Sequence, residues 1–249
     1  MPNIQPKARE ELADLEDIFA RAETAMGFVP TSFFMMGRKP EILRAFSRLS
    51  REVLGVPGVV PHDLKWLVAH VASRSAGCQY CSAHSGAAAA FKNGVPAEKV
   101  AAALDYATSP LFSGPERAAL AFAQAAGVQP NAVTRAHFDE LLKHFNEDQI
   151  VEITAVVCLF GWLNRWNDTM ATALEDEPLS FGETHLASSG WSVGRHTEEP
   201  SAKALSGLAP FAKAKRPETS RGVSVLAIQI VFFGDTLRPP IHCFLPHVA

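Results

Sequence analysis

The chain has 249 residues, of which 47% are hydrophobic and 20% are charged, and its formal net charge at pH 7 is −3. This is the composition of a globular protein that can bury a substantial core in one or two domains. The charge balance gives no basic footprint for nucleic acid and no polybasic patch for a membrane surface. No apolar run approaches the roughly 20 residues of a membrane span.

The N-terminal stretch MPNIQPKAREELADLEDIF has no apolar core and is acidic early, so it does not have the pattern of a signal or transit peptide. We therefore expect a cytoplasmic protein. In that compartment the four cysteines should stay mostly reduced, and a close pair favours catalysis or metal binding over a structural disulfide.

Apolar residues recur at helical spacing through most of the chain. Glycines and prolines at the boundaries fit helix ends and starts, as at Gly77 and Pro61. The predicted helices cover residues 7–26, 40–53, 61–76, 78–92, 96–107, 116–126, 132–145 and 147–174. No credible alternating strand interrupts them, so the predicted class is all-α.

The predicted helix 147–174 is the most hydrophobic, and we expect it to be the central buried helix. Its polar residues Asn164, Asn167 and Asp168 must then reach the surface or find partners, since an unpaired buried polar group costs about 1–3 kcal/mol. Cys158 lies in the same apolar helix and is expected to be a core residue.

Composition changes after about His196, where prolines become frequent and one β-branched run, Val223 to Phe233, stands out. We expect one helical domain over residues 1–196, followed by an irregular tail over residues 197–249. The sequence suggests no chemistry for the tail or for its cysteine, Cys243.

A CxxC pair, Cys78 and Cys81, lies at the junction between two predicted helices, with His84 three residues later. A helix N-terminus lowers the pKa of a thiol through its dipole and free N–H groups. One cysteine can attack an oxidant, and the other can resolve the sulfenic acid to a disulfide. A nearby histidine can carry the proton. The pattern therefore favours a redox site.

Two other interpretations of the pair stay open. Buried cysteines often act as small hydrophobic residues, so both thiols could be inert. A zinc site would use Cys78, Cys81 and His84, but it lacks a clear fourth ligand other than His70. We therefore expect no metal and no other cofactor.

Further stretches stand out besides the CxxC pair. They are GFVPTSFFMM, GCQYCSAH, SPLFSGPERAALAFAQA, EITAVVCLFGWLNRWND and GWSVGRH, which ends at His196. Together they resemble the carboxymuconolactone decarboxylase-like superfamily, and within it the alkylhydroperoxidase D branch. The resemblance covers about residues 7–196 and is most specific around the CxxC pair. The resemblance implies an all-helical fold, a homo-oligomer and a thiol peroxidase without haem or metal. It also implies that Cys81 is the peroxidatic cysteine and Cys78 its resolving partner.

The chain departs from the family pattern at the proton relay. The family has a glutamate twelve residues before the first cysteine and a histidine four residues after the second, where this chain has Trp66 and Ser85. His84 lies one residue early, which rotates it by about 100° around a helix. His70 or His62, each one helical turn from Trp66, is a candidate replacement for the missing acid.

We expect Cys81, Cys78, His84 and His70 to be catalytic, and Trp66, Tyr80 and Ser85 to contact the substrate. Trp66 would make the pocket drier, which raises the pKa of a thiol and suits an apolar substrate. The leading hypothesis is reduction of organic hydroperoxides, with an external dithiol reductant or adaptor. The alternatives are a decarboxylase or isomerase acting on a small lactone or ring acid, and a non-catalytic redox-sensing module.

Overall fold

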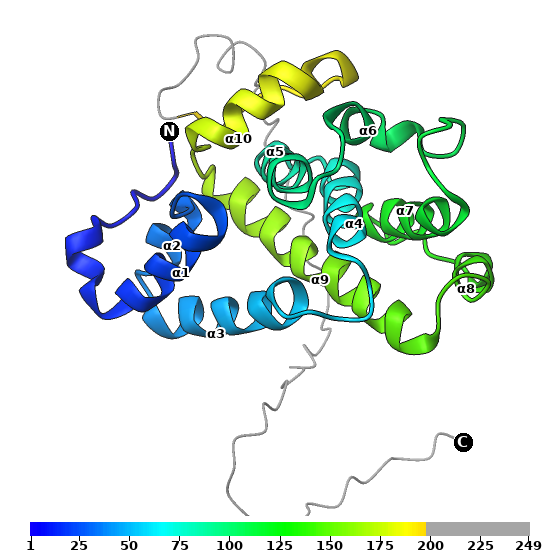
Figure 1. Ribbon diagram of the computed structural model, residues 1–249. Helices are drawn as coiled ribbons and strands as arrows, with labels where there is room; N and C mark the ends of the chain where they lie inside the picture. Colours follow the sequence, from blue (N-terminus) through cyan, green and yellow to red (C-terminus); the bar gives the residue numbers. More distant parts are fainter. Residues whose placement is uncertain (198–249) are drawn as a thin grey trace, which may run out of the picture. The chain divides into compact units, whose positions relative to one another are not determined.

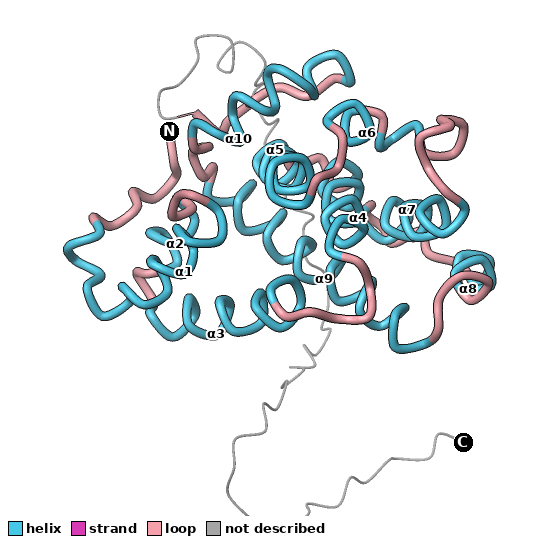
Figure 2. Tube along the Cα trace, viewed as in Figure 1, coloured by secondary structure: helices cyan, strands magenta, loops and turns pink. Residues whose placement is uncertain are grey.

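The structure, a computed structural model, describes residues 1–197. Every regular element in this part of the chain is a helix, which confirms the predicted all-α class (Figure 2). The α-helices are α1 (Glu16–Met26), α2 (Thr31–Met36), α3 (Pro40–Ser50), α4 (His62–Ser75), α5 (Gln79–Ala87), α6 (Ala97–Ala101), α7 (Gly114–Gly127), α8 (Arg135–Leu141), α9 (Glu147–Met170) and α10 (Asp176–Phe181). Short 3-10 or π turns are η1 (Arg9–Leu15), η2 (Arg51–Gly55), η3 (Ala88–Lys92), η4 (Ala103–Asp105), η5 (Gly182–Leu186) and η6 (Ala187–Ser189). The predicted tail lies outside the described residues.

Helix α4 packs against α5, α7 and α9, and α9 also contacts α5 and α7 (Figure 1). Helix α4 is buried on almost all sides, and it includes the polar residues Lys65, His70 and Ser73. The Lys65 ammonium donates to the Val53 carbonyl at 2.9 Å and to Glu152 at 3.0 Å, so its charge is buried with partners. A fully buried lysine is tolerated only when it is paired in this way.

Helix α9 packs against α4, α5 and α7, but it is not the fully central buried helix that we expected, because one of its faces is exposed. Val151, Cys158 and Trp162 are exposed along one face, so Cys158 is not a core residue. Asn164 and Asn167 lie on the opposite, buried face. The apolar exposed face made the whole helix look buried in the sequence.

Several predicted helix boundaries differ from the structure. The first helix is interrupted at Leu12, whose φ of −124° and ψ of 28° are not helical. The helices predicted over residues 96–107 and 132–145 are shorter, since α6 ends at Ala101 and α8 ends at Leu141. Helix α9 ends at Met170 because Ala171 adopts a left-handed conformation with a φ of 51°.

The turn at Ala171 directs the following segment back over the thiol junction. Leu174 N–H donates to the His196 carbonyl at 3.0 Å, and Trp191 Nε1 donates to the Gln79 carbonyl at 2.9 Å. These bonds hold residues 172–196, including the unpredicted helix α10, against the start of α5. Residues from three distant parts of the sequence therefore meet at one end of α5.

Candidate functional site

The thiol pair lies where α4 ends and α5 begins, as the sequence predicted. Gly77 has a φ of 79°, a left-handed conformation that glycine adopts without strain and that reverses the chain after α4. Cys78 is the N-cap of α5, and its Sγ accepts the N–H of Cys81 at 3.4 Å. Both cysteines are unpaired thiols in this structure. The geometry brings the two sulfurs together at a helix N-terminus.

The two thiols are closed off from solvent: Cys78 is 0% exposed and Cys81 is 2% exposed. Burial raises the pKa of Cys78, and the hydrogen bond shared with Cys81 and the negative charge of Asp168 raise it further. The backbone N–H of Cys81 opposes this shift. Cys78 therefore needs a nearby base to take up its proton before it can act as a nucleophile.

Asn167 of α9 supplies a donor to the second thiol. Its Nδ2 lies 3.4 Å from the Cys81 Sγ, and the side chain is fully buried. A donor aimed at the sulfur stabilises the thiolate over the thiol. The other amide atom, Asn167 Oδ1, is buried and has no hydrogen-bond partner among the described residues. The arrangement suits Cys81 as the attacking thiolate.

Beside Cys78 lie an acid and a histidine that the sequence had not indicated as site residues. Ligand atoms of Cys78, Asp168 and His196 all lie within 4.8 Å of one another. His196 Nε2 lies 3.2 Å from Asp168 Oδ1, and His196 Nδ1 lies 2.8 Å from the Thr172 carbonyl. We interpret the three groups as acid–base groups, because the His196 ring is already engaged by the Thr172 carbonyl and the Asp168 carboxylate.

His84 belongs to a separate cluster around Glu175. Its Nε2 lies 2.5 Å from Glu175 Oε2, and its ring stacks on Tyr80 at 4.4 Å between centroids. The Tyr80 hydroxyl and the Thr31 N–H also donate to Glu175. Burial alone would raise the pKa of Glu175, but His84 and backbone N–H donors outweigh it and lower that pKa. Glu175 therefore carries its charge in a nearly buried position.

The other predicted site residues lie around the pair without a hydrogen bond to either sulfur among the described contacts. His70 Nδ1 donates to the Ser82 carbonyl at 2.9 Å, and the Ser85 hydroxyl donates to the Cys81 carbonyl at 2.6 Å. Trp66 is partly buried and packs edge-on against Phe160. The catalytic and substrate-binding roles expected for His70, His84, Trp66, Tyr80 and Ser85 stay predictions.

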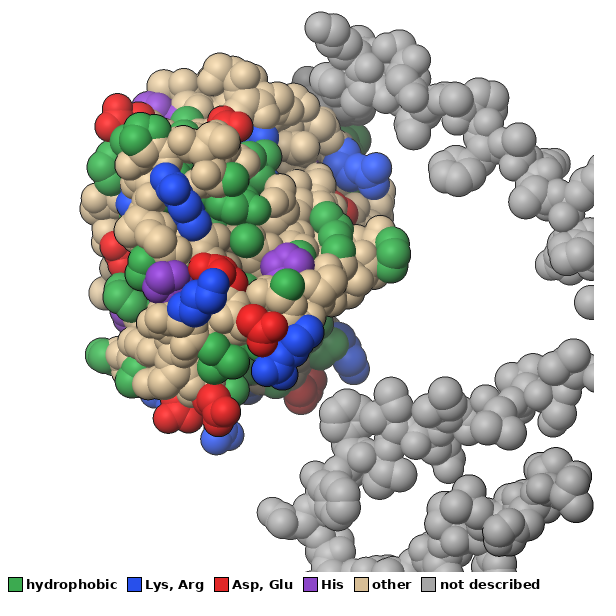
Figure 3. Space-filling view, turned by 90° about the vertical axis from the view of Figure 1, so that its right-hand side faces the viewer, with side chains coloured by type: hydrophobic (Ala, Val, Ile, Leu, Met, Phe, Trp, Pro, Cys, Tyr) green, Lys and Arg blue, Asp and Glu red, His purple; other side chains and the backbone are tan. Residues whose placement is uncertain are grey.

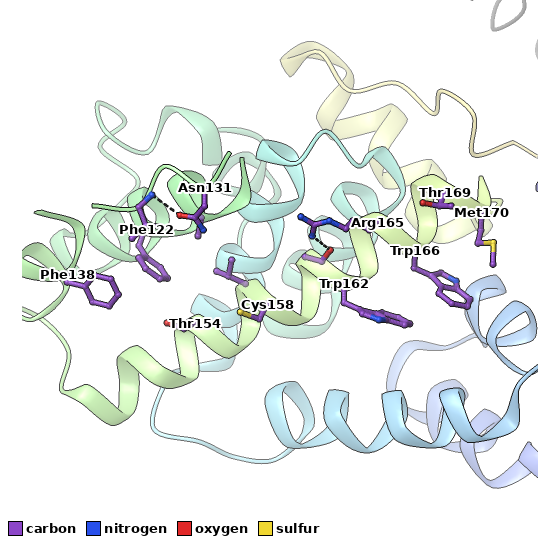
Figure 4. Close-up of a pocket in the computed structure, with 14 residues that line it drawn as sticks. Phe122, Asn131, Phe138, Thr154, Cys158, Trp162, Arg165, Trp166, Thr169 and Met170 are labelled. Carbon is purple, nitrogen blue, oxygen red and sulfur yellow. Dashed lines mark hydrogen bonds between the residues drawn. The ribbon is translucent and has the colours of Figure 1, made fainter. Parts of the chain in front are cut away.

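A large pocket of about 910 Å³ lies along the face of α9 that carries Cys158 and Trp162 (Figure 4). Cys158, Trp162, Trp166 and Phe138 are among its mostly apolar lining residues. Cys158 and Asn167 are nine residues apart, which places them about 180° apart around the helix. The pocket therefore does not open onto the thiols. A cavity of about 20 Å³, enough for one water, lies against His84 and Phe28 on the thiol side.

The groups that the sequence prediction missed had only weak signals. Asp168 and Asn167 stood out as polar residues in an apolar helix, and His196 ended the GWSVGRH stretch. Nothing in the acidic run around Glu175 distinguished it from a solvated loop. Their roles depend on the turn at Ala171, which periodicity does not reveal.

Comparisons with known proteins found a matching family model and one curated relative. The family model of the carboxymuconolactone decarboxylase family matches residues 40–125, which include the thiol pair. A stretch of 93 residues is 36% identical to the uncharacterized protein YnjA of Escherichia coli strain K12. This match covers 37% of this chain and 50% of the relative, so the chain spans about half the length of that relative.

Solved structures extend the likeness to the whole helical region. The debrominase Bmp8, as a cysteine-to-alanine variant in complex with 2,3,4-tribromopyrrole, is 34% identical with a TM-score of 0.68. That match covers 74% of this chain and 97% of the debrominase. The alkylhydroperoxidase D core of an uncharacterized peroxidase-related protein from Ralstonia eutropha JMP134 has the same fold, with 23% identity and a TM-score of 0.64. That match covers 71% of this chain and 94% of the peroxidase-related protein.

Proposed function

Because this chain belongs to the carboxymuconolactone decarboxylase superfamily with an alkylhydroperoxidase D-like fold, we propose that it is a thiol-dependent peroxidase acting on organic hydroperoxides. The observation that carries the proposal is the buried Cys78–Cys81 pair at the start of α5, with Asn167 donating to the Cys81 sulfur. The relatives include an enzyme, which supports an enzymatic role in general.

The proposed cycle begins at Cys81. Its thiolate attacks the terminal oxygen of the hydroperoxide, an S–O bond forms as the O–O bond breaks, and the alkoxide takes up a proton and leaves as the alcohol. Cys78 then attacks the sulfenic sulfur, so the S–S bond forms and the S–O bond breaks. The departing hydroxide takes up the Cys78 proton and leaves as water. An external dithiol reduces the disulfide and restores both thiols.

The closed surroundings of the pair favour an apolar substrate. Both thiols are buried, and aromatic rings of Phe28, Tyr80 and His84 lie together on the α5 side. A small polar oxidant gains nothing from such surroundings, whereas the alkyl or aryl part of an organic hydroperoxide can replace displaced side-chain contacts. Access requires these side chains to move apart.

Turnover measurements on cysteine variants test the proposal. With cumene hydroperoxide as oxidant and dithiothreitol as reductant, Cys81→Ser should reduce the rate by about a hundredfold or more, because the nucleophile is lost. Cys158→Ser is the matched control, since Cys158 is a free, exposed cysteine on the far side of α9. It should leave the rate unchanged. Equal rates for Cys81→Ser and the unmodified protein would overturn the proposal.

A second candidate, reductive debromination, is favoured by the match to the debrominase over 97% of its length. In this reaction the thiol pair supplies two electrons, bromine on an aromatic ring is replaced by hydrogen, and bromide and a disulfide are formed. Bromide release from a tribromopyrrole with dithiothreitol present would identify it. Bromide release without hydroperoxide turnover would replace the first proposal. The lactone-enzyme and redox-sensor hypotheses stay predictions.

A further inference from the structure

Cys78 must lose a proton during the proposed cycle, yet it has no contact with solvent. Its exposed fraction is 0%, and that of His196 beside it is 2%. Asp168, which contacts His196, has a side chain that is 38% exposed. Exposure therefore increases in one direction, from the thiol through the imidazole to the carboxylate. A proton that leaves Cys78 can reach water by this path.

The hydrogen-bond partners of His196 determine which ring nitrogen is available. The Thr172 carbonyl can only accept a hydrogen bond, so Nδ1, 2.8 Å away, carries a hydrogen. Nε2 is then the nitrogen that can take up a further proton, and it faces Asp168 Oδ1 at 3.2 Å. A carboxylate so close to Nε2 stabilises the imidazolium that forms when Nε2 takes up a proton. A ring nitrogen of His196 also lies within 4.8 Å of the Cys78 sulfur, so the imidazole is close enough to receive the thiol proton.

We propose that His196 and Asp168 form the proton relay of Cys78, with His196 Nε2 taking the thiol proton and Asp168 holding and passing it on. The relay rests on the proposed Cys78–Cys81 cycle. It serves the step in which Cys78 attacks the Cys81 sulfenic sulfur. The proton moves from Cys78 Sγ to His196 Nε2, the S–S bond forms, and the departing hydroxide is protonated through the same groups to give water. No net charge is created inside the protein.

The relay takes the place of the acid and histidine that this chain lacks at Trp66 and Ser85. The other titratable groups near it are Cys81, Tyr80 and Arg195. The Tyr80 ring lies 5.7 Å from the His196 ring, and its hydroxyl is committed to Glu175. Arg195 Nη1 donates to the Asp168 carbonyl at 3.4 Å. Neither Tyr80 nor Arg195 forms a hydrogen bond to His196 Nε2 among the described contacts.

The test follows the reactivity of Cys78 alone. In a Cys81→Ser background, the rate of modification by methyl methanethiosulfonate is measured against pH, and mass spectrometry assigns the adduct to Cys78. His196→Gln should slow this rate near neutral pH by about tenfold or more and shift the pH profile upward. His144→Gln is the matched control, because His144 also pairs with a carboxylate, Glu140, at 3.6 Å, and has no hydrogen bond to Cys78, Asp168 or His196 among the described contacts. It should leave the profile unchanged.

A second variant separates the relay from a simple effect of charge. Asp168→Asn removes a negative charge near Cys78, so an Asp168 that acts only through its charge would make Cys78 react faster in this variant. The relay requires the opposite, a slower reaction, because the amide no longer stabilises the proton that Nε2 takes from the thiol. A faster Asp168→Asn protein, or a folded His196→Gln protein with an unchanged profile, overturns the inference. The probe needs no hydroperoxide, so a wrong substrate class leaves this test intact.

Discussion

His70 shows how the partners of a histidine decide its role. It lies one helical turn after Trp66 on α4, where the sequence suggested a replacement acid, but its Nδ1 donates to the Ser82 carbonyl. Burial lowers its pKa from 6.5 to about 4, and Arg74 contributes in the same direction. The folded protein therefore holds His70 neutral, as a buried donor between α4 and α5.

This shift predicts a pH dependence of stability. Between about pH 6.5 and 4 the unfolded chain binds a proton at His70 that the folded protein does not, so the free energy of unfolding should fall as pH falls through this window. His70→Gln keeps an N–H donor and removes the titration, so its decrease should be smaller by up to about 3 kcal/mol. Urea unfolding at several pH values measures both slopes. Parallel curves would contradict the assignment, and His144→Gln serves as a partly exposed control.

Asn167 predicts the reactivity of the other thiol. Hydrogen bonds to charged groups contribute about 1.5–3 kcal/mol, so Asn167→Leu should slow alkylation of Cys81 by about tenfold or more near neutral pH. The measurement uses a Cys78→Ser background and iodoacetamide. Asn164→Leu is the matched control, since Asn164 is also buried on α9 and has no contact to a sulfur among the described hydrogen bonds. A Cys81 rate unaffected by Asn167→Leu would show that the amide does not stabilise the thiolate.

The sequence predicted that the two cysteines lie at a helix start, which the structure confirms, but it did not indicate most of the residues around them. Cys78 and Cys81 are close in sequence, and a CxxC pair at a helix start has a direct physical meaning. Asp168 and His196 meet only because the chain turns at Ala171 and returns over α5. Glu175 receives bonds from Thr31, Tyr80 and His84 across long sequence separations. Such contacts have no local pattern.

At the scale of elements, close packing of α5 on its neighbours depends on Gly86. A Cβ atom there would lie 2.7 Å from Phe181 Cε1 and 3.3 Å from the His70 ring. The glycine therefore lets α5 approach both α4 and α10, which together cover the thiol junction. Helix–helix contacts of this kind tolerate little additional volume.

Gly86→Ala should lower the free energy of unfolding by about 1–3 kcal/mol through overpacking. Gly161→Ala on α9 is the matched comparison, because the new Cβ would meet only Arg165 Nη1 at 3.7 Å. That variant should gain about 0.5–1 kcal/mol from the lower chain entropy of alanine. Thermal or urea unfolding of both variants measures the difference. Equal effects of the two substitutions would contradict the packing argument.

The success of helix prediction depended on length and periodicity. The long amphipathic segments that became α3, α4, α7 and α9 were found, because their apolar faces persist over several turns. Helices α6 and α8 are shorter than the sequence pattern predicted, because each ends at a local turn. Helix α10 is short and depends on tertiary contacts. Helix propensity is a weak guide at that scale.

The face seen in Figure 3 has no large patch of one charge sign. Positive and negative side chains are interspersed with apolar ones there. None of the described helices is long and apolar enough to cross a membrane. Exposed apolar residues lie along α9 beside the pocket, and a homo-oligomer would bury such a face. The homo-oligomer and the cytoplasmic location stay predictions.

Across the whole molecule, the central claim is that oxidation joins two particular thiols out of four. The most direct measurement is titration of free thiols before and after one equivalent of cumene hydroperoxide, followed by peptide mapping of any disulfide. We predict the loss of two thiols, a single Cys78–Cys81 disulfide, and intact thiols at Cys158 and Cys243. An unchanged thiol count, or a disulfide that involves Cys158 or Cys243 instead, would contradict the account.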